Sequence, residues 1–316
     1  MAEVSDQLLV VTIMAYLAAL MAYAAEYAFG SASAVTRVAR RELVGAGGPA
    51  VPSPSPSPEE AVEKSPKDRW IGIAVVGLTV AATAVHAATL ITRAIAAGRV
   101  PWGNMYEFLL ALTLVGSVAW VVVLWLRPGL RALGLLVTTV LIVLLGTSGM
   151  LHTDAGPLVP ALNSYWLAIH VSAVATAGGI LLVGFVSAVL YLLRESYENG
   201  RTGFPFALAA KAPAAAAIER VTFRVHAFAF PLLTVGIMCG AIWAEAAWGR
   251  YWNWDPKEVW SFITWVIYAG YLHARATPSI KRRTANWLAI AGWAAVVFNT
   301  YGVNLVFSGL HSYSGV

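Results

Sequence analysis

The chain of 316 residues has a single cysteine, Cys239, which falls inside an apolar run. One cysteine can form neither an internal disulfide framework nor a Cys-x-x-Cys redox pair, so any thiol chemistry must belong to another protein. Charged residues are also scarce, at 12% against 59% hydrophobic residues, and the mean hydropathy is +0.69. This composition excludes an ordinary soluble domain and is typical of a polytopic membrane protein.

Eight apolar runs are each long enough to cross the roughly 30 Å hydrocarbon core of a bilayer. They lie at residues 8–28, 70–92, 105–126, 132–151, 165–193, 222–244, 258–275 and 285–308. We therefore predict an all-α fold, a polytopic integral membrane protein with about eight transmembrane helices. The first run lacks the basic leader and cleavage site of a secretory signal, so residues 1–29 are predicted to keep a transmembrane helix.

The segment between the first two runs, residues 30–69, carries repeated Pro-Ser pairs and mixed charges. Such a segment has little to bury and predicts an extended linker. Residues 70–316 then form a seven-helix membrane domain.

The basic residues predict how the chain is oriented. Of the 21 lysines and arginines, 17 fall on the face that receives residues 30–69, and Arg93, Arg99, Arg250 and Lys257 fall on the other. Basic loops stay in the cytoplasm, which predicts a plasma membrane protein with a cytoplasmic linker and with both termini on the outer face. The net charge of +5 is thus a topology signal and does not indicate nucleic-acid binding.

Residues 243–260 gather five tryptophans and one tyrosine. So short a segment cannot cover that much aromatic surface by itself, so either a flat apolar ligand or the lipid interface must do so. The segment also encodes the start of a helix, with Asp255 as N-cap, Pro256 at the first position and Glu258 three residues after the cap. The predicted orientation puts this segment on the outer face.

Residues 248–275, WGRYWNWDPKEVWSFITWVIYAGYLHAR, resemble the tryptophan-rich "WWD" domain of haem-handling membrane proteins. The likeness is specifically to the CcsA/ResC family (CcsB in some bacteria) of System II cytochrome c biogenesis. Residues 101–107, 159–171 and 230–237 match that family too, and the resemblance extends over about residues 70–316.

The resemblance implies that haem b moves to the outer face and is held there by His170 and His311. It implies an inner haem ligand, His273, whose second axial partner comes from a CcsB/ResB-type membrane protein. An apocytochrome c then adds the thiols of its Cys-x-x-Cys-His site to the haem vinyl groups, with a thiol-reducing protein as a further partner. The implied cofactor-binding residues of the tryptophan-rich segment are Trp248, Trp252, Trp254 and Asp255.

Spacing separates the two implied haem positions. His273 lies fifteen residues after Glu258, or about 22 Å along a helix, so it cannot share an iron with the outer histidines. His226 is an alternative ligand for the inner haem. A hydrogen bond between helices is the other expected role of His226, and it is the expected role of His86. His152 is an alternative outer ligand. Arg250 and Lys257 are candidates for the haem carboxylates, and Lys257 is equally a candidate for lipid phosphate.

The sequence offers no residue that we would assign as a catalytic nucleophile or general base. The resemblance therefore implies a part of a holocytochrome c synthase complex whose own chemistry is positioning. A haem exporter or chaperone that hands haem to a separate ligase is the alternative, and a subunit with an aromatic belt and no cofactor is a third possibility.

Overall fold

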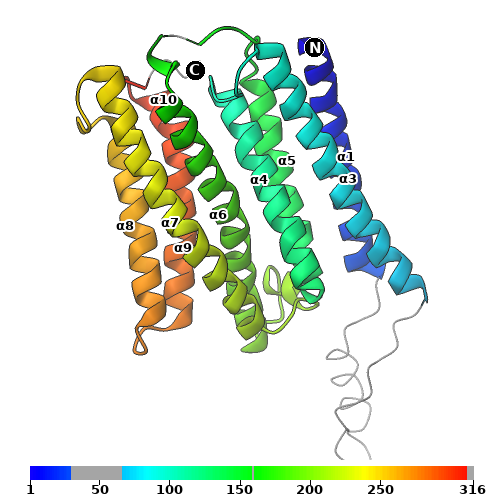
Figure 1. The fold of residues 1–316 in the computed structure, drawn as a ribbon. Coiled ribbons are helices and arrows are strands. Elements are labelled where there is room, and N and C mark those ends of the chain that lie inside the picture. The colour runs from blue at the N-terminus through cyan, green and yellow to red at the C-terminus, as the bar shows by residue number, and fades with distance from the viewer. Residues whose placement is uncertain (30–65, 159, 312–316) are drawn as a thin grey trace, which may run out of the picture.

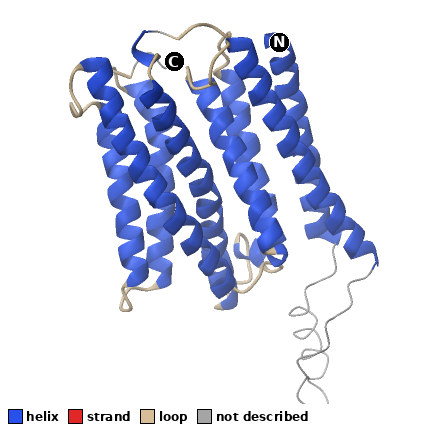
Figure 2. Cartoon of the chain, in the orientation of Figure 1, coloured by secondary structure: helices blue, strands red, loops and turns tan. Residues whose placement is uncertain are grey.

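The computed structural model describes residues 1–29, 66–158 and 160–311, and this part of the chain is helical with no strand (Figure 2). The predicted linker lies almost wholly outside these ranges, although the second long helix already begins at Pro66. The long helices are α1 (Ala2–Phe29), α3 (Pro66–Ala97), α4 (Met105–Leu126), α5 (Gly134–Met150), α6 (Tyr165–Glu198), α7 (Ala215–Trp248), α8 (Pro256–Ala276) and α9 (Arg282–Val297). A π-helical turn, η4 (Phe298–Gly302), and α10 (Val303–Val306) continue α9.

Seven of these helical spans in the described residues are long and apolar enough to cross a membrane. The exception is α8, because it has charged residues near both ends and several tryptophans and tyrosines along its length. Its 21 residues span about 31 Å, and it runs alongside α7 and α9 (Figure 1). The protein is therefore a multi-pass, all-α membrane protein, as the apolar runs predicted.

The helices form one bundle in which α6 packs against α4, α7 and α9, while α1 packs against α3 and α5. The N-terminal helix is thus part of the bundle. Tyr16 and Thr12 of α1 hydrogen-bond to His86 and Thr89 of α3, both fully buried. Lipid tails are as apolar as the helix surfaces, so burial of apolar side chains does not by itself drive helices together in a membrane. Hydrogen bonds between helices, such as these two, therefore contribute to their association.

One end of the bundle collects the features that the sequence singled out. The start of α1, the connection from α7 to α8, the connection from α5 to α6, and α10 all lie at this end (Figure 1). The turn between α8 and α9 and the last residues of α1 lie at the other end. When α8 is counted with the seven apolar spans, the chain crosses the bundle an even number of times, so α1 starts and α10 ends at the same end.

Candidate functional site

A cavity opens among α4, α6, α7, α8 and η4 near that end of the bundle. Its empty volume is about 1400 Å³, which includes open solvent at the mouth. Most of the lining is apolar or aromatic. His170 and His311, separated by 141 positions in the chain, both line this one cavity.

His170 lies in the second turn of α6 and points at α7. Its Nδ1 donates to the carbonyl oxygen of Gly236 over 2.7 Å, which leaves Nε2 as the nitrogen that carries a lone pair. The ring fits because residue 240 is glycine, since a Cβ there would lie 2.6 Å from His170 Cε1 and Nδ1. Gly240 therefore leaves the notch that holds this imidazole, and the carbonyl of Gly236, one turn earlier on α7, fixes its orientation.

His311 follows α10 and is fixed by the residue that begins α8. Its Nδ1 lies 2.8 Å from Oδ1 of Asp255, and the Leu310 amide donates to Oδ2 of the same carboxylate over 2.7 Å. Asp255 also accepts from the Lys257 amide, and Glu258 accepts from the Asp255 amide, so the predicted capping box is present. One buried carboxylate thus caps a helix and orients a histidine.

The environment of Asp255 favours its ionised form. Burial by itself raises the pKa of this carboxyl, but the hydrogen bonds from His311, Leu310 and Lys257 outweigh burial, and the pKa lies below its ordinary value. A carboxylate that accepts from Nδ1 of a histidine leaves Nε2 as the metal-binding nitrogen and makes it more basic.

Trp243, buried near the end of α7, touches both histidines. Its ring is stacked on that of His170, with the ring centroids 6.1 Å apart and an interplanar angle of 12°. It meets the His311 ring edge-on, with a centroid distance of 5.8 Å and an interplanar angle of 63°. The Trp248 ring packs against Trp243 and His311, with ring-centroid distances of 4.7 Å and 5.0 Å. The histidines and these indoles form one aromatic wall of the cavity.

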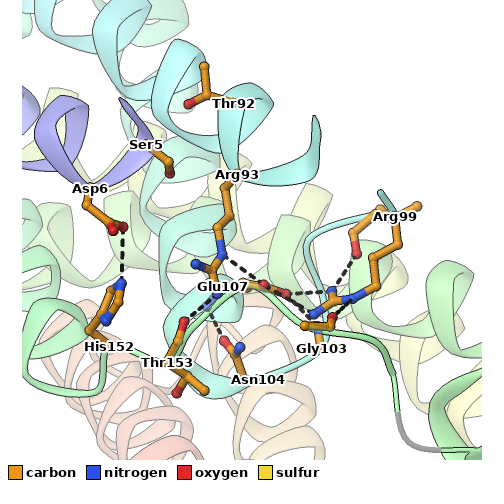
Figure 3. Close-up of polar contacts among 12 residues, drawn as sticks. Ser5, Asp6, Thr92, Arg93, Arg99, Gly103, Asn104, Glu107, His152 and Thr153 are labelled. Carbon is orange, nitrogen blue, oxygen red and sulfur yellow. Dashed lines mark hydrogen bonds and ion pairs between the residues drawn. The ribbon is translucent and has the colours of Figure 1, made fainter. Parts of the chain in front are cut away.

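The rim of the cavity beside α4 is held by a buried ion cluster. Glu107 has no exposed side-chain surface, and it accepts from Arg93 over 3.0 Å, from Arg99 over 2.8 Å and from the Gly103 amide over 2.8 Å (Figure 3). Asn104 caps α4 by accepting from the Glu107 amide. Since Gly103 and Asn104 line the cavity, the predicted helix start also shapes its edge.

The same arginines hold the connection between α5 and α6. Arg93 donates to the Thr153 carbonyl and Arg99 to the Gly156 carbonyl over 3.1 Å. In the sequence, both arginines indicate only the orientation of the chain in the membrane. Their structural role could not be read from the sequence, because their carboxylate partner and the two carbonyls lie on other segments.

The remaining candidates in the tryptophan-rich segment divide between cavity and surface. Trp248 and Trp252 line the cavity. Trp254 is 68% exposed, does not line it, and has a positive φ of 57°. Arg250 is exposed and donates to Asn253, whereas Lys257 lines the cavity.

The other four histidines lie away from this cavity. His273 is exposed in the last turn of α8, at the opposite end of that helix, as the spacing required. His226 is buried under Tyr268 and Tyr271, and its Nδ1 bonds to the Thr222 carbonyl. His152 pairs with Asp6 over 3.0 Å and packs against Tyr106, and His86 bonds to Tyr16.

Gly240 and Ser261, which were not singled out from the sequence, also line the cavity. The pair Gly236 and Gly240 is a Gly-x-x-x-Gly pattern in an apolar run, the usual sign of close helix approach. That signal was available in the sequence. The π-turn that carries Asn299 has no comparable signature.

This set of side chains fits a haem. Neutral imidazoles bind haem iron, and each of the two here has its Nδ1 engaged by an oxygen. Broad aromatic and apolar walls suit a flat porphyrin.

Comparison with known proteins identifies the family of this chain. A family model described as "Cytochrome C assembly protein" matches residues 102–311, well over half of the chain. The chain belongs to this family. Its relatives include the cytochrome c biogenesis protein CcsA of Guillardia theta, 37% identical over 254 residues that cover 75% of this chain and 84% of that protein.

The CcsA proteins of Microcystis aeruginosa and Zea mays are each 34% identical to this chain. They cover 77% and 71% of it, and the matches extend over 86% and 80% of their own lengths. The family resemblance predicted from the sequence is confirmed, and this membership supports a role in cytochrome c maturation. The matched region includes both cavity histidines and the tryptophan-rich segment.

Proposed function

We propose that this protein holds haem b between His170 and His311 and presents it to the Cys-x-x-Cys-His site of apocytochrome c. One observation carries the proposal: imidazoles from two distant segments line one cavity, with Trp243 in ring contact with both. Ligation by two imidazoles without a covalent tether allows later release.

The residues of the chain contribute orientation and exclusion of water. The Gly236 carbonyl and the Asp255 carboxylate each fix one imidazole through its Nδ1. The indoles of Trp243 and Trp248 and the apolar wall keep water from the ring. Haem supplies two vinyl groups, and each thiol of the apocytochrome adds across one vinyl double bond, forming a carbon–sulfur bond while its hydrogen goes to the other vinyl carbon.

The proposal includes a route for haem. Haem arrives from the cytoplasmic side, where His273 is one ligand and a CcsB/ResB-type partner supplies the other. The exposure of His273 supports this, because a side chain at the bundle surface is accessible to a second membrane protein. The cavity and the tryptophan-rich segment then face the outer side of the plasma membrane, and a thiol-reducing protein keeps the apocytochrome cysteines reduced.

Replacement of single histidines tests the proposal in protein purified with its partner. We expect absorption bands of haem with two imidazole ligands in the wild type. His170→Ala and His311→Ala should each lose the outer haem, His273→Ala should lower the amount loaded, and His152→Ala should match the wild type. Full haem retention in the first three variants refutes the proposal.

Co-expression with an apocytochrome separates presentation for attachment from simple export. We expect covalent haem–cytochrome product that depends on His170 and His311. If bound haem is present and delivered but no product forms without an added ligase, the protein is an exporter or chaperone.

A further inference from the structure

Lys257, in the first turn of α8, lines the cavity. No other lysine or arginine among the described residues does so. Glu258 is the acidic residue in the lining, but its Oε2 accepts from the Asn253 and Asp255 amides as part of the helix cap. Within the described ranges, Lys257 forms no ion pair with a carboxylate. The Asp255 carboxylate is near enough to interact electrostatically with this ammonium group, but it is bonded instead to His311, Leu310 and the Lys257 amide, so no described carboxylate pairs directly with Lys257 Nζ.

The ammonium group is held in place by the π-turn. Lys257 Nζ donates to the carbonyl oxygen of Asn299 over 3.0 Å, and Asn299 lies within η4 and lines the cavity. One of the three ammonium hydrogens is thus used, and the others have no partner among the described residues. A π-turn within an α-helix is frequent at functional sites because it displaces the local backbone.

Two other polar groups at the cavity wall have no hydrogen-bond partner among the described residues. The Asn299 amide bonds to Ser261 Oγ over 3.0 Å through Nδ2, and its other end, Oδ1, is buried without a partner in the described chain. Because a serine hydroxyl can donate as well as accept, this amide can turn over and offer N–H groups. The indole Nε1–H of Trp102, another lining residue, is also buried without an acceptor.

Unpartnered donors around a fixed ammonium in an apolar cavity are costly unless a ligand supplies acceptors. We propose that Lys257, positioned by Asn299, binds a carboxylate of the haem propionates and so sets which edge of the ring faces α8. The inference rests on the proposed function, because it assumes that haem occupies the cavity. It adds to that function a residue that sets the orientation of the bound haem. The imidazoles fix the position of the iron, and Lys257 fixes the rotation of the porphyrin ring about the iron.

The orientation has a consequence for attachment. Haem carries both propionates on one edge, so a carboxylate anchored at Lys257 directs the vinyl-bearing part of the ring away from the start of α8. A porphyrin without free carboxylates retains the iron and the apolar surface and loses only this anchor. The phosphate of an anionic lipid is the other source of anionic oxygen for Lys257, and a porphyrin ester distinguishes the two.

The test compares ferric haem with its dimethyl ester by absorbance titration of the purified protein with its partner. The proteins are the wild type, Lys257→Gln, Lys257→Arg and Arg250→Gln. Arg250 is the matched control, because it is a cation of the same segment that is exposed and bonded to Asn253. Thermal unfolding of each variant reports folding.

We expect the wild type and Arg250→Gln to bind haem about ten- to a hundredfold more tightly than the ester, the usual range for a charge-assisted hydrogen bond. Lys257→Gln should lose that preference while keeping the two-imidazole spectrum, and Lys257→Arg should keep most of it. Equal preference in the wild type and in Lys257→Gln overturns the assignment to Lys257 and leaves the haem site standing. Absence of the two-imidazole spectrum with both porphyrins in the wild type overturns the proposed function as well.

Discussion

His311 Nδ1 lies 2.8 Å from Oδ1 of Asp255, across 56 positions of sequence. The same carboxylate caps α8, so the segment after α10 and the tryptophan-rich segment share one anchoring group. A helix cap is usually a matter of stability alone. Here the cap also determines where an imidazole lies beside Trp243 and Trp248.

Asp255→Ser separates these two roles of Asp255. Serine caps a helix about as well as aspartate, but its short side chain cannot reach His311 as the carboxylate does. We expect haem affinity to fall about ten- to a hundredfold, the usual effect of losing a partner of a metal-bound histidine. Haem titration measures affinity, and thermal unfolding of the haem-free protein should change little. Unchanged haem affinity would contradict the orienting role.

Gly240→Ala tests the notch on α7. The new Cβ would lie 2.6 Å from the His170 ring, so the imidazole must move away from the Gly236 carbonyl. We predict loss of the outer haem band. Gly270→Ala on α8 is the control, since nothing lies within 4 Å of its Cβ position and alanine is the better helix former by about 1 kcal/mol. The prediction is wrong if both variants retain haem equally.

Trp254→Asn tests whether the surface indole is strained. A φ of 57° costs a residue other than glycine roughly 1–2 kcal/mol, and asparagine tolerates this conformation better. The variant loses an edge-on contact with Trp252 at 5.8 Å, worth about 0.5–1.5 kcal/mol. We expect unfolding at the wild-type temperature or above, whereas Trp252→Asn loses the same contact without relief and should unfold at a lower temperature. The reverse order argues against strain.

The elements were predictable from the sequence where the information is local. Hydropathy located the helices, and the pattern of Asp255, Pro256 and Glu258 located the start of α8. Counting 1.5 Å per residue separated His273 from the outer histidines. The sequence could not predict hydrogen bonds between residues that are distant along the chain, because these depend on how the helices pack. They are the bonds of His311 to the Asp255 carboxylate, of His170 to the Gly236 carbonyl, and of Lys257 to the π-turn carbonyl.

Glu107→Gln tests how the rim of the cavity is held. The change is nearly isosteric, but it leaves the buried guanidinium of Arg93, and that of Arg99, without a carboxylate. Removing one partner of a buried ion pair costs about 3–5 kcal/mol, because the remaining charge stays desolvated. The thermal unfolding midpoint of the haem-free protein should therefore drop clearly.

Glu195→Gln is the matched control for that experiment. Glu195 pairs with Arg283 over 3.0 Å, but both side chains are partly exposed, and exposed pairs contribute about 0–1 kcal/mol. We expect this variant to unfold near the wild-type temperature. If the two variants lose equal stability, Glu107 is not more important than a surface pair. If Glu107→Gln alone is destabilised and also releases haem faster, the arginine cluster stabilises the bundle and the cavity edge together, because Gly103 and Asn104 belong to both.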